Sequence, residues 1–258
     1  MRSSLIEKTV PAAFVGESRE AMGYKAAEDI AHELRQRLKM QRGVRMIFAA
    51  APSQSEMLAA LIGMADIDWS RVTAFHMDEY LGLAPDAPQR FGLWLRRAIF
   101  DRLPFAAVHL LEPGADAEVA AAEYADKLAE SPIDIVCCGI GANGHLAFND
   151  PPADLNDPAD VKVVQLDRAC RQQQVDDRCF ERFEDVPTHA LTLTVPRLLA
   201  SDRIFCCVPG ALKKTAVRRT LKDAISGEVP ATALRTHSNW SLYLDEDSAA
   251  DLDGDGAQ

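Results

Sequence analysis

The stretch IDIVCC-GIGANGHLAFNDP, from Ile133 to Pro151, decides the fold because a strand pattern runs directly into a glycine-rich loop. Its first six residues form a short, mostly apolar run of the length typical of a strand that is covered on both faces. Three glycines within the next six positions permit tight turns and close approach of a ligand to the backbone. The stretch therefore predicts a buried strand that ends at a ligand-binding loop.

Similar strand patterns recur along the chain and alternate with longer amphipathic segments. We expect further strands over residues 44–51, 72–76, 108–111, 190–195, 203–208 and 240–244. Apolar residues at helical spacing predict helices over residues 18–40, 53–64, 91–102, 117–130, 171–182 and 211–224. Alternating strands and helices are typical of βαβ units, whose right-handed crossovers place helices on both faces of a sheet. The predicted fold class is therefore α/β, with three α/β/α layers around a Rossmann-like, mostly parallel sheet.

The predicted helix over residues 53–64 begins with residues that are typical of a helix N-terminus. Ser53 could cap the helix expected over residues 53–64, with Glu56 three positions later completing a capping box. Such a helix N-terminus, following a strand, is also a place where backbone amides can meet an anion.

The composition is that of a single globular domain. Hydrophobic residues make up 48% and charged residues 26% of 258 residues, and no repeat or linker divides the chain, so we expect one domain over residues 1–258. The tail over residues 246–258 is rich in Asp, Ala and Gly, and we expect it to be flexible. Residues 1–15 lack the apolar core of a signal peptide or anchor, and no window matches a membrane span.

The net charge and the cysteine spacing limit the classes of ligand and the cysteine chemistry that are expected. The formal net charge of -11 disfavours nucleic acid and anionic membranes, so an anionic small molecule would need a local cationic or amide-lined pocket. No CxxC spacing occurs, and the adjacent cysteine pairs would point to opposite faces of their strands, which suits neither a disulfide nor a metal. We expect reduced and mostly buried thiols, as in a cytoplasmic protein. The six cysteines are Cys137, Cys138, Cys170, Cys179, Cys206 and Cys207.

Polar residues collect where the predicted strands end, which is where open parallel sheets bind ligands. Asp78 and Glu79 directly follow an apolar strand, so they are poorly solvated and could have the raised pKa that a proton-abstracting base needs. They could equally cap a helix or pair with an arginine, and for Glu79 we favour a salt bridge. His145 and Asp150 lie within five residues and could form an oriented acid–base pair, although a structural turn would also accommodate them.

Two motifs together resemble the glucosamine-6-phosphate deaminase/isomerase family. Met77-Asp78-Glu79-Tyr80 matches the MDEY motif of that family, and Gly139–Pro151 matches its GxGxxGHxAFNEP motif. The similarity continues through segments 186–192, 210–213 and 234–237, and so covers most of the chain. The sister family of 6-phosphogluconolactonases is similar in fold, but Tyr80 and Ala147-Phe148-Asn149 favour the deaminase side.

The resemblance implies isomerisation and deamination of an amino-sugar 6-phosphate to a ketose 6-phosphate and ammonia, without a metal or nucleotide cofactor. Asp78 would carry the C2 proton to C1. His145, oriented by a carboxylate at Asp150, would assist ring opening, and Lys213 would bind the phosphate. The expected partner is therefore a small sugar phosphate. The family includes single-subunit and multi-subunit forms, so a homo-oligomer is compatible with the resemblance.

The chain departs from the family pattern around the catalytic loop and the phosphate. Segment 50–55 lacks the usual Thr-Gly-Gly-Thr loop, which leaves Ser53 and Gln54 at the following helix start as candidate anion ligands, together with the Gly144 backbone. Asn143 stands where Asp is frequent and cannot raise the basicity of His145 by charge. Asp150 replaces Glu and retracts its carboxylate by roughly 1.5 Å, one C–C bond.

No arginine follows the loop where the family has a Ser-Arg-Thr-Arg run. Arg171 is the best substitute as a phosphate ligand, with Lys162 behind it, the alternative being a surface helix residue. Three other residues have structural interpretations that we favour. Arg90 would lie at a solvated helix start, His76 within a strand, and His237 in packed structure.

Two other functions stay open at this point. Related folds bind sugar phosphates as signals, and the altered phosphate loop and Asn143 keep such a weakly catalytic sensor under consideration. A lactonase acting on a sugar-acid phosphate would require hydrolysis in place of C2 proton transfer.

Overall fold

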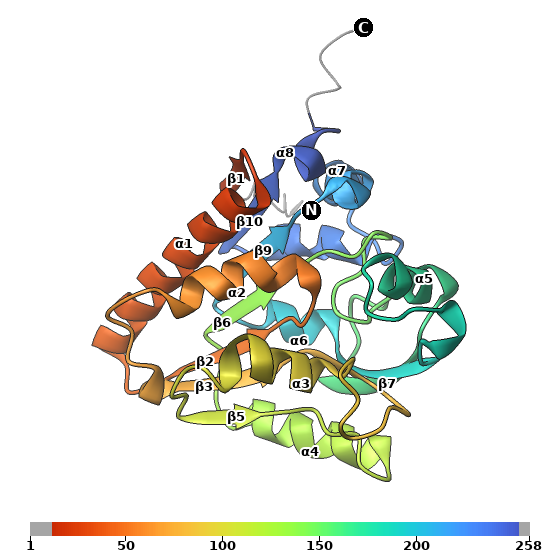
Figure 1. Ribbon diagram of the computed structural model, residues 1–258, viewed down its shortest axis with the longest axis horizontal. Coiled ribbons are helices and arrows are strands. Elements are labelled where there is room, and N and C mark those ends of the chain that lie inside the picture. Colours follow the sequence, from red (N-terminus) through yellow and green to blue (C-terminus); the bar gives the residue numbers. More distant parts are fainter. Residues whose placement is uncertain (1–11, 253–258) are drawn as a thin grey trace, which may run out of the picture.

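The computed structural model describes residues 12–252 and contains a central sheet of seven parallel strands in the order β1-β10-β9-β6-β2-β3-β5 (Figure 1). The strands are β1 (Ala12–Gly16), β2 (Val44–Phe48), β3 (Val72–His76), β4 (Asp78–Tyr80), β5 (Ala107–His109), β6 (Ile135–Cys138), β7 (Val161–Gln165), β8 (His189–Leu193), β9 (Arg203–Val208) and β10 (Trp240–Asp245). The α-helices are α1 (Arg19–Met40), α2 (Ser55–Ile62), α3 (Phe91–Leu95), α4 (Ala117–Ala129), α5 (Arg168–Asp176), α6 (Val195–Leu199), α7 (Lys214–Lys222) and α8 (Glu246–Ala249).

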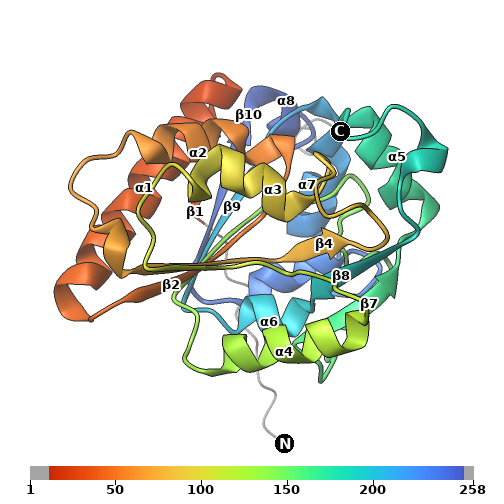
Figure 2. The ribbon, with the colours of Figure 1, turned by 60° about the horizontal axis from the view of Figure 1, so that its bottom comes forward.

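Helices cover both faces of this sheet, which confirms the predicted three-layer α/β/α class. Successive residues of a strand point to opposite faces. Accordingly, Met46 and Phe48 of β2 join the apolar core beneath α1, α2 and α3, while Ile47 joins the core beneath α4, α6 and α7. Figure 2 shows α1, α2 and α3 on one side of the sheet, with α4 and α6 on the other.

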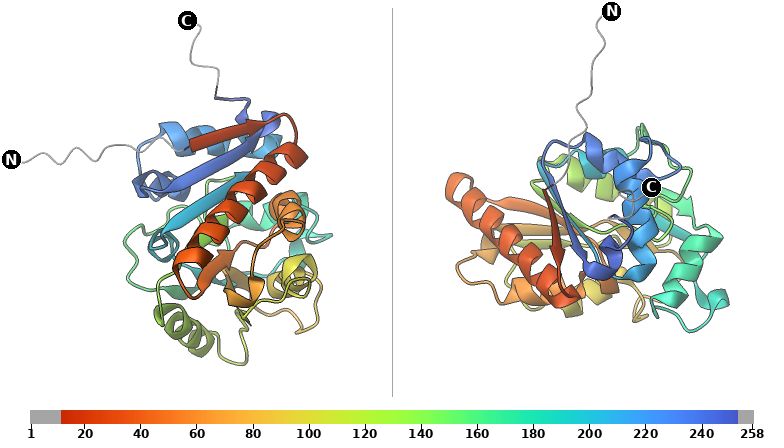
Figure 3. Two further views of the ribbon diagram at one scale, coloured as in Figure 1. Left: turned by 90° about the vertical axis from the view of Figure 1, so that its left-hand side faces the viewer. Right: turned by 90° about the horizontal axis from the view of Figure 1, so that it is seen from above.

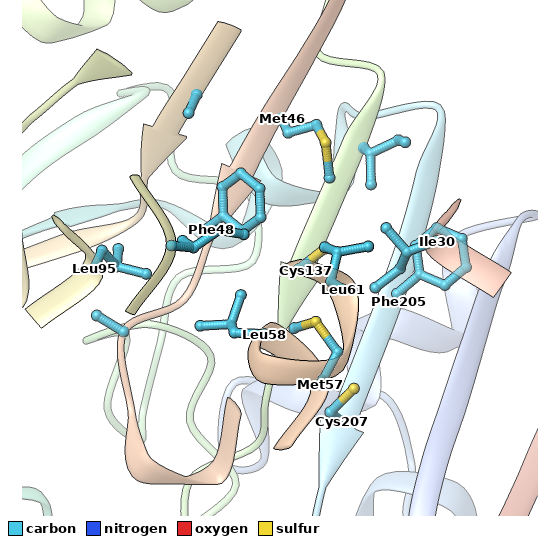
Figure 4. Packing of buried hydrophobic residues seen from close by; sticks show 14 of the residues in the cluster. Ile30, Met46, Phe48, Met57, Leu58, Leu61, Leu95, Cys137, Phe205 and Cys207 are labelled. Atoms are coloured by element: carbon cyan, nitrogen blue, oxygen red, sulfur yellow. The ribbon is translucent and has the colours of Figure 1, made fainter. Parts of the chain in front are cut away.

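The core on the α1–α3 side is built largely from aliphatic and sulfur-containing side chains. Figure 4 shows the α2 side chains over the strands, with Leu58 near Phe48, Leu61 near Cys137 and Met57 near Cys207. Leu61 and Phe48 are fully buried, and Met57 and Leu58 nearly so. Each fully buried aliphatic side chain of this size contributes about 1.5–3 kcal/mol to folding through the hydrophobic effect. The buried face of α2 therefore holds the helix against the sheet and fixes the position of residues 49–54, which precede it.

The first and last described strands lie side by side and complete the sheet at one edge. β1 pairs in parallel register with β10, from Ala12 against Ser241 to Gly16 against Asp245. Figure 3 shows red β1 next to blue β10 although they come from opposite ends of the sequence.

A second, three-stranded antiparallel sheet corrects one sequence expectation. The strand expected over residues 190–195 forms as β8, but it lies outside the central sheet and pairs with β4 and β7. Asp78 of β4 lies opposite Thr192 of β8. This pairing fixes the backbone of β4, which follows β3 in the chain. In Figure 2 β4, β8 and β7 lie beyond the carboxyl end of the central strands.

Local capping corrects two helix starts. Ser53 lies in a 3-10 turn over Pro52–Gln54, and α2 begins only at Ser55 without a side-chain cap, so the predicted capping box is wrong. Glu56 instead pairs with Arg19 of α1 at 3.1 Å. Helix α5 begins earlier than predicted because the Asp167 carboxylate caps it by accepting from the Cys170 amide.

The remaining expectations concern the chain ends and the thiols. Residues 246–249, assigned to a flexible tail, form α8, because Asp245 and Ser248 exchange side-chain-to-backbone hydrogen bonds in a capping box. The described part of the chain leaves out residues 253–258 of the predicted tail. It also leaves out residues 1–11, where the sequence predicted no signal peptide or anchor. All six cysteines are free and only Cys179 is not fully buried, as expected. Among residues 12–252 no helix has both the length and the apolar character needed to cross a membrane.

Candidate active site

A pocket of about 580 Å³, part of it open to solvent, lies at the carboxyl edge of the central sheet. Its walls come from the segments that follow β2, β3, β6 and β9, together with α5. The polar residues lining it are Ser53, Gln54, Asp78, His145, Gln173, Gln174, Asp177 and Lys213. Five of these eight were predicted from the sequence, and the structure brings them to one cavity.

Asp78 presents a buried carboxylate to this pocket. It is the first residue of β4, and its backbone is held by the pairing with β8, so the side chain is only 7% exposed. Burial raises the pKa of Asp78 well above its usual value, and the neighbouring Glu79 carboxylate raises it further. Within the described residues no hydrogen bond or salt bridge reaches the Asp78 carboxylate. It is therefore free to exchange a proton with a ligand.

His145 shares the pocket and is coupled to a carboxylate behind it. Its Nδ1 lies 3.2 Å from Oδ1 of Asp150. The Asn143 amide links the two residues, because its Nδ2 donates to Asp150 Oδ1 at 3.1 Å and its Oδ1 accepts from the His145 amide at 3.1 Å. Burial opposes ionisation of Asp150, but contacts with His145, Asn143 and the Asp167 amide lower its pKa. The 3.2 Å contact does not meet hydrogen-bond geometry at Nδ1, but it places a carboxylate beside the imidazole, an arrangement that suits acid–base chemistry.

The loop between β6 and His145 depends on two of its glycines. A Cβ at Gly141 would lie 2.3 Å from the His145 ring, so only glycine lets the ring take this place. Gly144 has φ +90 and its amide donates to Gly141 O, while its own carbonyl accepts from Ala231. Gly144 was predicted to meet the substrate, but it does not line the pocket, because its backbone is used in the turn.

Lys213 supplies the one cation among the described residues that line this pocket. It ends a 3-10 turn whose entry is fixed by Asp245, which accepts from the Gly210 amide at 2.9 Å. Burial lowers the pKa of Lys213, while Asp177 and Cys170 act in the opposite direction. Ser53 lines the same pocket from the segment that follows β2, and its hydroxyl accepts from Gln54 at 3.2 Å. Gln54 is fully buried and donates to the Cys207 carbonyl at 3.1 Å.

Glu79, adjacent to Asp78, has a structural role and does not line the pocket. Its carboxylate accepts from the amides of Tyr80, Phe91 and Gly92, each at 3.0 Å, and lies 3.5 Å from Arg90. This agrees with the salt-bridge interpretation, and it corrects the proposal that Glu79 binds substrate. His76 is fully buried and accepts from the Leu111 amide at 2.6 Å, and burial beside Arg90 lowers its pKa to about 3.

Arg171 is not brought to the pocket, which corrects its assignment as a phosphate ligand. Its guanidinium donates to the carbonyls of Phe183 and Val186 and lies 4.2 Å from the Phe183 ring centroid. Lys162 is paired with Asp157 at 2.7 Å. His237 bonds the Ser201 carbonyl at 2.7 Å, in agreement with its structural interpretation.

Sequence reasoning missed the contribution of α5, which forms a wall of the pocket. Gln173 accepts from the Ala142 amide at 2.8 Å and donates to Asp177 at 3.2 Å. Gln174 accepts from the Tyr80 hydroxyl. The two glutamines thus attach α5 to both motifs. The available signal was the run Gln172-Gln173-Gln174 in an amphipathic segment, where polar residues would ordinarily face solvent.

One group within residues 12–252 could present three metal-ligand atoms, namely His145, Asp150 and Cys170, whose donor atoms lie within 4.8 Å of one another. Burial, with the nearby Asp150 carboxylate, raises the pKa of the Cys170 thiol. A protonated thiol beside a carboxylate that already contacts Asn143 and His145 favours a hydrogen-bonded cluster. The arrangement as it stands suits acid–base chemistry.

Comparison with known proteins places this geometry in context. Residues 17–243 match the family described as glucosamine-6-phosphate isomerases/6-phosphogluconolactonase. A glucosamine-6-phosphate deaminase of Listeria monocytogenes serotype 4a is 34% identical over 80% of this chain and 87% of its own length. A glucosamine-6-phosphate deaminase of an Exiguobacterium species is 35% identical over 71% of each chain.

Solved structures show the same architecture. A monomeric glucosamine-6-phosphate deaminase superposes with a TM-score of 0.84 at 27% identity, over 93% of this chain and 99% of its own. A 6-phosphogluconolactonase from Trypanosoma brucei superposes with a TM-score of 0.78 at 18% identity, over 94% of this chain and 99% of its own. At that identity the lactonase is evidence for the fold alone.

Proposed function

The chain belongs to the glucosamine-6-phosphate isomerase/6-phosphogluconolactonase family, and on that premise we propose that it converts an amino-sugar 6-phosphate to a ketose 6-phosphate and ammonia. The single observation that carries the proposal is the free, buried Asp78 carboxylate in the same pocket as the His145–Asp150 pair and Lys213. Abstraction of a carbon-bound proton needs a positioned base with a raised pKa, and Asp78 has both properties.

In the proposed reaction His145 first moves a proton between the ring oxygen and the C1 hydroxyl, which opens the sugar ring. Asp78 then takes the proton from C2 while the C1 carbonyl oxygen gains a proton, which gives an enolamine. Asp78 returns its proton at C1 and the C2 amino group loses one, so C1 becomes a hydroxymethyl group and C2 an imine. Water adds at C2 and ammonia leaves, giving the ketose. The Asp150 carboxylate, whose lowered pKa keeps it charged, supports a protonated His145 during ring opening.

We assign the phosphate to the neighbourhood of Lys213 and Ser53. The Lys213 ammonium is buried and forms no hydrogen bond to any part of the chain from 12 to 252, so a phosphate oxygen would give it a partner. Ser53 offers a hydroxyl across the pocket. The Arg171 position contributes nothing here, so the phosphate is held with fewer cations than the Ser-Arg-Thr-Arg pattern would provide.

A lactonase activity is the second candidate, because the family and its fold include 6-phosphogluconolactonases. The curated relatives at 34% and 35% identity are named deaminases, which favours the first reaction. We also propose a cytoplasmic location, in keeping with six free cysteines. Homo-oligomer formation stays a prediction.

The test is to incubate the protein with glucosamine 6-phosphate in heavy water while ammonia release and loss of the C2 proton signal are followed. Both should occur, and both should depend on Asp78. A parallel incubation supplies 6-phosphogluconolactone. Hydrolysis of that lactone by a protein that shows no C2 exchange with glucosamine 6-phosphate would support the second candidate and contradict the first. Binding without ammonia or exchange would favour the sensor alternative.

A further inference from the structure

Asp177 occupies an unfavourable position that its local surroundings do not explain. It is the C-cap of α5 and follows Asp176, so two acidic residues stand at the end of a helix where the macrodipole is negative. Cations, not carboxylates, are favoured at such an end. Departures from a local rule without local compensation concentrate at functional sites, and Asp177 lines the pocket while Asp176 is exposed.

The Asp177 carboxylate is held in place without being neutralised. Gln173 donates to its Oδ2 at 3.2 Å and is itself fixed to the Ala142 amide of the catalytic loop at 2.8 Å. The backbone then turns back at Arg178, which has φ +60 and whose amide donates to Val175 at 2.9 Å. Within the described chain Asp177 forms no salt bridge, although Lys213 lines the same pocket.

Such a fixed carboxylate is unsuited to a second contact with phosphate, because two anions repel. Asp177 and Lys213 line the same pocket, so a sugar phosphate whose phosphate lies at Lys213 occupies the cavity that Asp177 borders. The groups of an open-chain sugar phosphate next to its phosphate-bearing end are hydroxyls on C4 and C5. Hydroxyls donate to carboxylates, and bonds to a charged acceptor are stronger than neutral ones.

We propose that Asp177, positioned by Gln173, accepts hydrogen bonds from the C4 and C5 hydroxyls and thereby selects the sugar that the enzyme takes. This inference rests on the proposed function and extends it to the substrate class, a polyhydroxy chain with free hydroxyls beside the phosphate-bearing carbon. It also assigns α5 a role in specificity separate from the chemistry at Asp78 and His145.

The experiment compares three sugars in wild type, Asp177→Ala, Asp177→Asn and Asp176→Ala. The sugars are glucosamine 6-phosphate, its 4-deoxy analogue and, as a substrate control, its 3-deoxy analogue. The measurements are kcat/KM for ammonia release and affinity by titration calorimetry. We expect wild type to prefer the parent sugar over the 4-deoxy analogue by about 10- to 100-fold, the range for a charged hydrogen bond. Asp177→Ala should reduce this ratio to about 3-fold or less, whereas Asp176→Ala should keep it.

Each outcome separates the two proposals. If wild type releases ammonia but Asp177→Ala lowers kcat/KM for parent and analogue by the same factor, Asp177 acts through Lys213 and the specificity role is wrong. If ammonia is not released but the affinity ratio collapses in Asp177→Ala, the reaction is wrong and the hydroxyl contact stands. Lack of binding of all three sugars contradicts both. Asp177→Asn, which preserves size, should fold as wild type and show an intermediate ratio.

Discussion

Replacing Asp78 by asparagine should abolish activity and at the same time stabilise the protein. Asn has nearly the same shape but cannot take a proton from C2. A positioned general base contributes about 10²–10⁴-fold to a rate, so kcat should fall by at least about that factor. Substrate affinity should change little, because Lys213 and Asp177 are untouched.

The expected stabilisation follows from the burial of the Asp78 carboxylate without a partner in the described structure. The pKa of Asp78 is raised, so the folded protein retains this proton over a pH range in which the unfolded chain has lost it. Stability is therefore lost as the pH rises through the raised pKa, and it is fully present below the ordinary pKa of Asp. Relief of an unsatisfied buried charge contributes about 2 kcal/mol. For a protein of this size that corresponds to an increase in Tm of about 4–8 °C.

The assay is Tm by calorimetry at a series of pH values, from mildly acidic to mildly alkaline buffer. The gain in Tm for Asp78→Asn should grow with pH and shrink toward acid. An unchanged or lowered Tm at alkaline pH, or substantial residual C2 exchange, would refute the reasoning. Glu79→Gln is the matched control, because the Glu79 carboxylate accepts three backbone hydrogen bonds. Gln has one acceptor oxygen, so this variant should be destabilised by about 1–3 kcal/mol.

Three further predictions address other parts of the site. Lys213→Met should raise KM for phosphorylated sugars by about 10- to 100-fold, because a charged hydrogen bond is lost. It should also raise Tm, because it removes an ammonium whose pKa burial has lowered. An unchanged KM in steady-state assays would exclude Lys213 as the phosphate ligand. Asn143→Asp should place a second carboxylate 3.1 Å from Asp150 and raise the pKa of Asp150, so the acid limb of the kcat–pH profile should move to higher pH; a superimposable profile would contradict the orienting role of Asp150. Arg171→Leu should leave KM within about 2-fold but lower the free energy of unfolding by about 1–3 kcal/mol, because hydrogen bonds to two backbone carbonyls and the contact with the Phe183 ring are lost. A large rise in KM with unchanged urea denaturation would restore Arg171 as a substrate ligand.

The sequence predicted the layers and part of the site because those features depend on local periodicity and on chain order. The apolar run over residues 133–138 predicted a strand, which forms as β6 over Ile135–Cys138, and the run over 203–208 forms β9. Amphipathic segments between such runs predicted the helices. Residues that follow parallel strands must gather at one edge of the sheet. The strand-end rule therefore predicted where polar residues gather. The family resemblance then singled out Asp78, His145 and Lys213, with Ser53 and Gln54 at the helix start that stands in place of the usual phosphate loop, and all five line the pocket.

Tertiary structure decided what local pattern could not express. The sequence could not show that the Arg171 guanidinium donates to the Phe183 and Val186 carbonyls and stays out of the pocket lining. Asp78 and Glu79 are adjacent and chemically similar. Only the pairing of β4 with β8 turned one toward the pocket and the other toward the amides of α3.

The role of α5 shows the same division. Helical spacing predicted a helix over residues 171–182, and the structure begins it at Arg168 behind the Asp167 cap. The 3.6-residue period says nothing about which distant loop a polar face will meet. The bonds of Gln173 to Ala142 and of Gln174 to Tyr80 join segments about 31 and 94 residues apart in the chain. Amino-acid order thus determined the elements and the chemistry available at their ends, whereas packing over long sequence separations decided which carboxylates, amides and cations share one cavity.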